Sequence, residues 1–246
     1  MRPGFVAGCL LILSPLFGQT GSPERPKNII MVIGDGMGLA HIALAEYLHR
    51  PPSPLQRMEI VGLQKTHSDS HLETDSGASG TAMSCGVETF NAAIGVDADS
   101  VPVTTIMELA RDHGYKTGFV VTSSVVHATP ASFYAHVPSR GSYESIATQL
   151  VESGIDVFVG GGEKYFYNRN LDNKDLLGLL RTKNYELIRS QDPHGKFRVD
   201  NIPREKKIAC FTAFEDPARA SLGRTYFPWM VQKALDALEK RADKGY

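Results

Sequence analysis

Short, continuous runs of apolar residues recur along this chain, and they alternate with segments of helical periodicity. Apolar runs without polar alternation are typical of strands that are buried on both faces of a parallel sheet. Strands are expected at 27–33, 60–65, 116–121, 155–159 and 207–211, and helices at 39–48, 104–113, 143–152, 175–182 and 228–241. This alternation predicts an α/β fold, a three-layer α/β/α sandwich around a mostly parallel sheet.

The composition is that of a globular protein and excludes several classes of partner. Of the 246 residues, 42% are hydrophobic and 22% are charged, so the chain can bury a sizeable core. The formal net charge is −1, and both signs are mixed along the chain, with no basic stripe. We therefore expect no nucleic-acid partner, and function has to be inferred from local sites.

Residues 1–20 have the pattern of a secretory signal peptide, an apolar run flanked by Arg2 and by small polar residues. The alternative is a membrane anchor, but the run is short for a bilayer and predicts no stable membrane span. A secreted or periplasmic location is expected. Cys85 and Cys210 could pair there or remain buried as small apolar residues.

A polar loop ends at Asp75-Ser76, and the small residues from Gly77 to Ser84 then favour a tightly packed helix that Ser76 would open. Unpaired backbone N–H groups and the positive end of the helix dipole favour an oxyanion at such a position. Ser76 is therefore a candidate nucleophile. The alternative is that Asp75 or Ser76 only caps the helix, since both residue types are preferred caps.

The turn Gly34-Asp35-Gly36-Met37-Gly38 follows the first expected strand. It does not match the dinucleotide-binding pattern G-x-G-x-x-G, because Leu39 occupies the place of the third glycine. A carboxylate between two glycines at a strand end suits a metal ion. Asp35 is thus a candidate metal ligand, with a turn-capping residue and a nucleotide loop as alternatives.

His127, Thr129 and Arg140 lie in a polar segment that follows the expected strand 116–121. An arginine there could bind a phosphate or carboxylate through two parallel hydrogen bonds, or it could form a surface ion pair. His127 could be a ligand or a structural, hydrogen-bonded residue. His67 and His71 precede Asp75-Ser76 and are weaker ligand candidates, because a short loop is a mobile platform.

Together, several segments in this order resemble the alkaline phosphatase family. The resemblance covers nearly the whole chain after the signal and is carried by residues 27–38, Thr74-Asp75-Ser76-Gly77-Ala78-Ser79-Gly80-Thr81-Ala82, 91–97, His127-Ala128-Thr129-Pro130-Ala131, Ala135-His136-Val137-Pro138-Ser139-Arg140 and Gly160-Gly161-Gly162.

The resemblance implies a phosphomonoesterase with two zinc ions and one magnesium ion. Ser76 matches the nucleophile that becomes a phosphoserine, and Arg140 matches the residue that binds two phosphate oxygens. Asp35 matches the carboxylate that bridges one zinc and the magnesium, and Thr129 matches a magnesium ligand. His127 matches a position held by Asp or His in the family, beside the magnesium site. Phosphomonoesters and inorganic phosphate are the implied ligands, and a homodimer is possible for the full-length form.

The family draws most of its zinc ligands from a later half, which has no counterpart before Tyr246. Residues 24–246 are accordingly interpreted as the N-terminal portion of an alkaline phosphatase-like catalytic domain, truncated before those ligands. The sequence therefore predicts little phosphatase activity for this polypeptide, since Asp35 and Ser76 do not complete a tetrahedral zinc site. The alternative is a non-catalytic secreted fragment that binds phosphate or metal.

Overall fold

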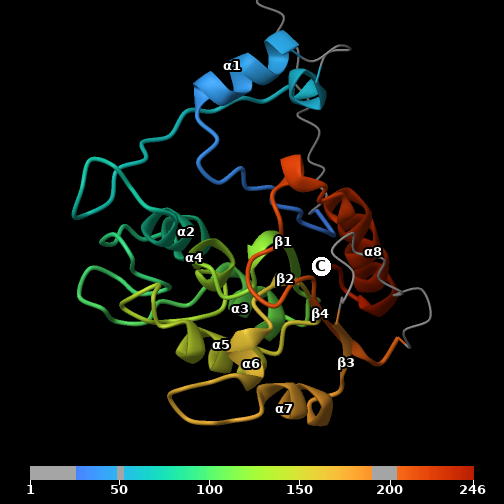
Figure 1. The fold of residues 1–246 in the computed structure, drawn as a ribbon. Helices are drawn as coiled ribbons and strands as arrows, with labels where there is room; N and C mark the ends of the chain where they lie inside the picture. The colour runs from blue at the N-terminus through green and yellow to red at the C-terminus, as the bar shows by residue number, and fades with distance from the viewer. Residues whose placement is uncertain (1–25, 49–52, 190–203) are drawn as a thin grey trace, which may run out of the picture.

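A four-stranded parallel sheet lies at the centre of the fold (Figure 1). The computed structural model describes residues 26–48, 53–189 and 204–246. The sheet has the order β1-β2-β4-β3, and every pair of neighbouring strands is parallel. Its strands are β1 (Gly118–Ser124), β2 (Val157–Gly161), β3 (Tyr185–Arg189) and β4 (Lys207–Phe211).

Helices cover both faces of this sheet. One face packs against α5 (Tyr143–Glu152), α6 (Lys164–Tyr167) and α7 (Leu176–Thr182), and Phe158 of β2 lies at the centre of that core. The other face packs against α8 (Tyr226–Arg241), whose Met230 and Leu238 join a second buried cluster. Strands buried on both faces require layers on both sides, so the expected α/β/α arrangement is confirmed.

Three further helices pack together beside the sheet. They are α2 (Ser76–Cys85), α3 (Ile106–Asp112) and α4 (Ala128–Ala131). Helix α2 begins and ends as its sequence predicts, with Asp75 as the N-cap and Gly86 as a left-handed C-cap at φ 71°. The remaining elements are α1 (Leu39–Leu48) and the 3₁₀ turns η1 (Pro54–Arg57) and η2 (Ala220–Leu222).

Most of the expected elements after residue 100 are present. Helix α5 and strand β4 have the predicted bounds, and the other helices and strands agree within a few residues. Strand β3 was not expected, because it is short and charged at Glu186 and Arg189. Part of the polar loop expected around residues 190–207, namely 190–203, lies outside the described residues, as does the predicted signal at 1–20.

The prediction of strands at 27–33 and 60–65, the two nearest the N-terminus, is wrong. Neither segment forms a sheet ladder among the described residues, and Val32 and Leu63 are 87% and 95% exposed. The Ile29 N–H donates instead to the Tyr246 carbonyl at 2.8 Å, and the Lys116 N–H donates to the neighbouring Gly245 carbonyl at 3.0 Å. The last two residues therefore lie where a ladder between 27–33 and β1 would have to form.

Helix α1 has its predicted bounds but buries none of its residues. No helix in residues 26–48, 53–189 and 204–246 is long and apolar enough to cross a membrane. Cys85 and Cys210 are both free thiols, and their possible pairing is not realised.

Candidate active site

Asp35 brings together three segments that are far apart in the sequence. The Ser76 hydroxyl donates to Asp35 Oδ1 at 3.1 Å, and the Thr129 hydroxyl donates to Asp35 Oδ2 at 2.7 Å. Asp35 itself is exposed in a turn where Gly36 adopts a φ of +66°. The turn, the start of α2 and the start of α4 thus converge on one carboxylate.

Ser76 is the first residue of α2 and is half-buried, while Asp75 before it caps the helix. Asp75 Oδ1 accepts the Ala78 N–H at 2.9 Å and the Ala92 N–H at 3.0 Å. The capping and nucleophile interpretations are therefore compatible, because they fall on adjacent residues. The cap fixes the helix start, and the start places the Ser76 hydroxyl beside Asp35.

Burial raises the pKa of Asp75, but the hydrogen bonds from Ala78 and Ala92 and the charge of Arg140 outweigh this effect. The net result is a pKa below the ordinary value, so Asp75 is ionised at neutral pH.

Arg140 is held close to Ser76 by its ion pair with the adjacent residue. Its Nη1 donates to Asp75 Oδ2 at 2.9 Å, and its backbone N–H donates to the Ala92 carbonyl at 2.7 Å. The side chain is 33% exposed, which leaves part of the guanidinium open to solvent. An arginine fixed on one edge by a carboxylate can still present donors to a phosphate oxygen.

His127 lies next to this cluster but forms its contacts with other residues. Its Nε2 is 3.4 Å from Asp216 Oδ2, and its ring stacks on Tyr143 with centroids 6.1 Å apart. The Ser124 N–H donates to Asp216 Oδ1 at 2.7 Å and fixes that carboxylate. Asp216 was missed from the sequence, although it follows β4 closely, just as His127 and Thr129 follow β1.

His67 and His71 do not join Asp35 through any hydrogen bond in the described structure. His67 Nε2 pairs with Glu88 Oε1 at 3.1 Å, and His71 Nδ1 is 2.7 Å from the Ser70 hydroxyl. Both histidines are exposed. Their contacts are local to the loop that precedes α2.

The donors around Asp35 fit magnesium better than zinc. A carboxylate and two hydroxyl oxygens are hard donors, which suit magnesium with water completing the shell. Zinc prefers several His, Cys or carboxylate ligands. Within the described residues, no group of three or more such side chains could hold a metal ion. The residues present therefore fit a magnesium site in part and do not fit a two-zinc site.

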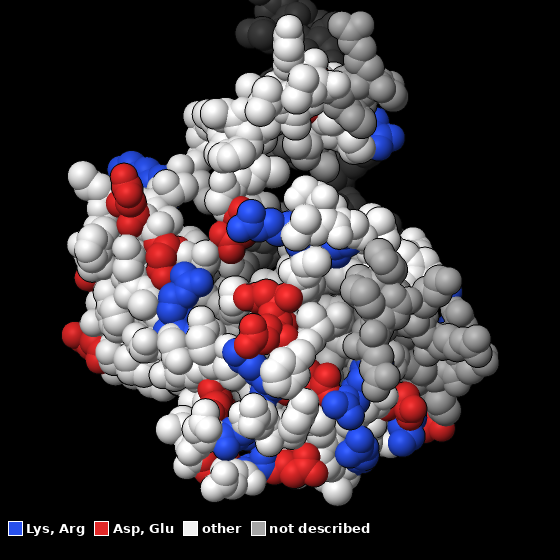
Figure 2. All heavy atoms as spheres, in the orientation of Figure 1, with Lys and Arg blue, Asp and Glu red and all other residues white. Residues whose placement is uncertain are grey.

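The cluster lies where α/β proteins place their ligands, just beyond the carboxyl end of a parallel strand. His127 and Thr129 follow the end of β1 at Ser124. On the face shown in Figure 2, acidic and basic side chains are interspersed, without a large patch of one sign. On this face, selectivity for an anion must then come from local groups such as Arg140.

The fold and this site define an α/β/α protein with a polar site at the carboxyl end of its parallel sheet. The family profile described as "Alkaline phosphatase" matches residues 26–191. This match covers more than half of the chain. The chain therefore belongs to the alkaline phosphatase family.

Individual relatives support the assignment. The chain is 37% identical over 272 aligned positions to the "Repressible alkaline phosphatase" of Saccharomyces cerevisiae, covering 96% of this chain and 48% of that protein. The alkaline phosphatase of the Antarctic bacterium TAB5 superposes with a TM-score of 0.81 at 38% identity, over 90% of this chain and 63% of that one.

A histidine-to-aspartate variant of the TAB5 enzyme, with magnesium bound in its M3 site, gives a TM-score of 0.82 at 38% identity, over 89% of this chain and 62% of that one. The chain spans about a third to a half of the curated relatives it matches.

Proposed function

We propose that this chain carries the phosphate-handling part of a metal-dependent phosphomonoesterase that works through a phosphoserine at Ser76. The observation that supports the proposal is the convergence of the Ser76 and Thr129 hydroxyls on the two oxygens of Asp35. Membership of the alkaline phosphatase family supports the same reaction class.

In this proposal, the residues of the chain orient the nucleophile and the substrate. Asp35 Oδ1 accepts the Ser76 hydrogen bond and so fixes the direction of the Ser76 oxygen. Arg140 binds the phosphoryl oxygens, while the ionised Asp75 keeps its guanidinium next to Ser76. Ser76 attacks phosphorus, the bond to the leaving alcohol breaks, and water then releases phosphate from the serine.

Asp35 and Thr129 are the residues that would hold magnesium, with His127 beside them. Bound magnesium would supply positive charge next to the transferring phosphoryl group. For zinc, we propose that the ligands come from outside the described residues, because those residues contain no sufficient cluster. A secreted or periplasmic location, from the signal-like residues 1–20, and a possible homodimer remain part of this proposal.

A second function is favoured by one observation. The same lack of a zinc-type ligand cluster among the described residues fits a non-catalytic protein that binds phosphate or a hard cation. In that case Arg140 would bind phosphate or Asp35 would bind the cation, without any covalent step at Ser76.

Release of phosphate from a chromogenic aryl phosphate, with zinc and magnesium added at alkaline pH, tests the catalytic proposal. We expect slow turnover that the Ser76→Ala variant abolishes. A Ser79→Ala variant on the same helix serves as the matched control and should retain the wild-type rate. Turnover that is equal in wild type and Ser76→Ala would contradict the role of Ser76, and brisk turnover would contradict the need for outside zinc ligands.

A further inference from the structure

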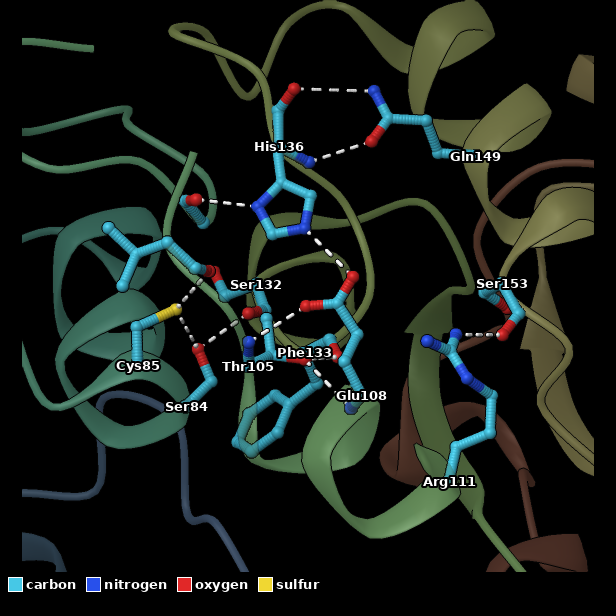
Figure 3. A network of polar contacts seen from close by, with 12 residues as sticks. Ser84, Cys85, Thr105, Glu108, Arg111, Ser132, Phe133, His136, Gln149 and Ser153 are labelled. Atoms are coloured by element: carbon cyan, nitrogen blue, oxygen red, sulfur yellow. Dashed lines mark hydrogen bonds and ion pairs between the residues drawn. The ribbon is translucent and has the colours of Figure 1, made fainter. Parts of the chain in front are cut away.

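His136 lies at the centre of a polar network away from Asp35, and the proposed reaction does not use it. Figure 3 shows its ring pointing toward Glu108 of helix α3 and its backbone beside Gln149 of α5. Its Nδ1 is 2.6 Å from the Gly95 carbonyl oxygen, and its Nε2 is 3.1 Å from Glu108 Oε1. The side chain is only 17% exposed.

Both ring nitrogens of His136 therefore face oxygen atoms that accept hydrogen bonds. A carbonyl oxygen can only accept, so Nδ1 carries a hydrogen. Burial raises the pKa of Glu108, but the Thr105 N–H and the His136 ring outweigh this and bring it below the ordinary value. The ring is thus held from both sides, by the Gly95 carbonyl and by the Glu108 carboxylate.

The backbone of His136 is fixed as firmly as its ring. Its N–H donates to Gln149 Oε1 at 2.8 Å, and its carbonyl accepts Gln149 Nε2 at 3.3 Å, both from α5. Gly95 permits the close approach of the ring, because a Cβ there would lie 2.8 Å from His136 Nδ1 and 2.1 Å from the Ala135 carbonyl.

The network continues directly to Arg140. Val137, which follows His136, exchanges two backbone hydrogen bonds with Ile94, which precedes Gly95. Their lengths are 2.9 and 3.0 Å. Three residues later, the Arg140 N–H donates to the Ala92 carbonyl, and the Ala92 N–H donates to Asp75. Residues 92–95 and 136–140 thus form a two-segment ladder with His136 at one end and the Asp75–Arg140 ion pair at the other.

We propose that His136 is a positioning residue, held between Gly95 and Glu108, that fixes the ladder bearing Arg140 and so sets the place of the phosphate-binding guanidinium. The statement about phosphate rests on the proposed function, whereas the rigidity of the ladder does not. Removing the ring would leave the Gly95 carbonyl and the Glu108 carboxylate without their shared partner.

Among the residues that the structure describes, Glu108 is the only charged group within hydrogen-bonding distance of the ring. Glu108 faces it from α3, and the neutral Gln149 faces it from α5. Cys85 of α2 lies near Glu108, but burial raises the pKa of its thiol, so it stays neutral. Loss of the contact between the ring and Glu108 is therefore the change that should loosen the ladder.

Hydrogen exchange of the Arg140 and Val137 amides in the whole chain, recorded without metal or substrate, tests this link. We expect Glu108→Gln and His136→Ala each to lower the protection of both amides by about tenfold, which corresponds to one charge-assisted hydrogen bond. Glu152→Gln, on the exposed side of α5, is the matched control and should leave the protection unchanged. Wild-type protection in both variants would overturn the proposal.

The same experiment separates loosening of the ladder from loss of the fold. The amides of β2 and β4 should keep their wild-type protection in both variants, because the loosening is confined to the ladder. If His136→Ala fails to fold, Glu108→Gln, which keeps the ring, carries the comparison. An equal fall of protection in the sheet and in the ladder would overturn the link. Wild-type phosphatase turnover despite the lost protection would count against the role of Arg140 in the proposed reaction alone.

Discussion

At the scale of single residues, Asp75 makes more of the contacts that hold the site together than Ser76 does. One carboxylate caps α2, accepts the Ala92 N–H and pairs with Arg140. The sequence indicated the cap, because Asp precedes a run of small residues. It could not indicate the Arg140 pair, which joins residues 65 positions apart and depends on the fold of the loop between them.

Replacing Asp75 by Ala should lower the free energy of unfolding by about 1–3 kcal/mol, because the cap is lost and the Arg140 charge loses its partner. Asp75→Asn keeps an oxygen for the cap and should cost less. Urea denaturation of both variants at neutral pH measures the two contributions. Equal stability of wild type and Asp75→Ala would contradict this assignment.

The contribution of Asp75 should also depend on pH in a defined direction. Its pKa is lower in the folded chain than the ordinary 3.8, so its stabilisation is fully present above pH 3.8 and is lost as the pH falls through the folded value. The stability difference between wild type and Asp75→Asn should therefore shrink in acid. A difference that stays constant from pH 7 down to pH 3 would be inconsistent with the ion pair.

Two glycines with similar backbone angles provide a matched pair. Gly95 has a φ of +58° and lies against the Ala135 carbonyl, whereas Gly36 has a φ of +66° and open space around it. Gly36→Ala should cost about 1–2 kcal/mol for the left-handed backbone alone. Gly95→Ala should cost clearly more, because its Cβ also collides with the backbone. Thermal unfolding compares the stability of the two variants. Equal losses of stability in Gly36→Ala and Gly95→Ala would argue against the close approach of His136 to Gly95.

At the scale of elements, helix α2 shows how small residues position the nucleophile. A Cβ on Gly77 would lie 2.8 Å from the Ala93 carbonyl, so the first turn of α2 approaches the loop at 92–93 closely. Helix propensity alone would make Gly77→Ala stabilising by about 0.5–1 kcal/mol. We expect Gly77→Ala to lower the free energy of unfolding instead. Ala82→Gly on the exposed side of the helix calibrates propensity, and a stabilising Gly77→Ala would contradict the packing.

Strand prediction succeeded for β1, β2 and β4 and failed for residues 27–33 and 60–65. The β4 sequence is apolar on both faces and lies between β2 and β3, so its pattern was sufficient. Residues 27–33 have an equally apolar pattern, but their backbone bonds to Tyr246 and not to β1. Asp216 was missed for a related reason, since its role appears only when the ends of β1 and β4 are seen together.

At the scale of the whole molecule, apolar side chains lie exposed along the N-terminal third of the described chain. Ile29, Val32, Ile60 and Leu63 are 65%, 87%, 94% and 95% exposed. Exposed apolar surface of this extent promotes association. Gel filtration with light scattering should show concentration-dependent self-association, and Val32→Lys with Ile60→Lys should reduce it. A wild-type chain that stays monomeric at high concentration would contradict this expectation.

The central claim is that Ser76 accepts a phosphoryl group, and its most direct test is the site of covalent labelling. The chain, with zinc and magnesium, is incubated with an aryl phosphate, quenched in acid and mapped by mass spectrometry, beside Ser76→Ala and Ser79→Ala. We expect phosphate on Ser76 in the wild type and in Ser79→Ala, and none in Ser76→Ala. Phosphate on another residue, or none on a folded wild-type chain, would contradict the claim and favour the non-catalytic function.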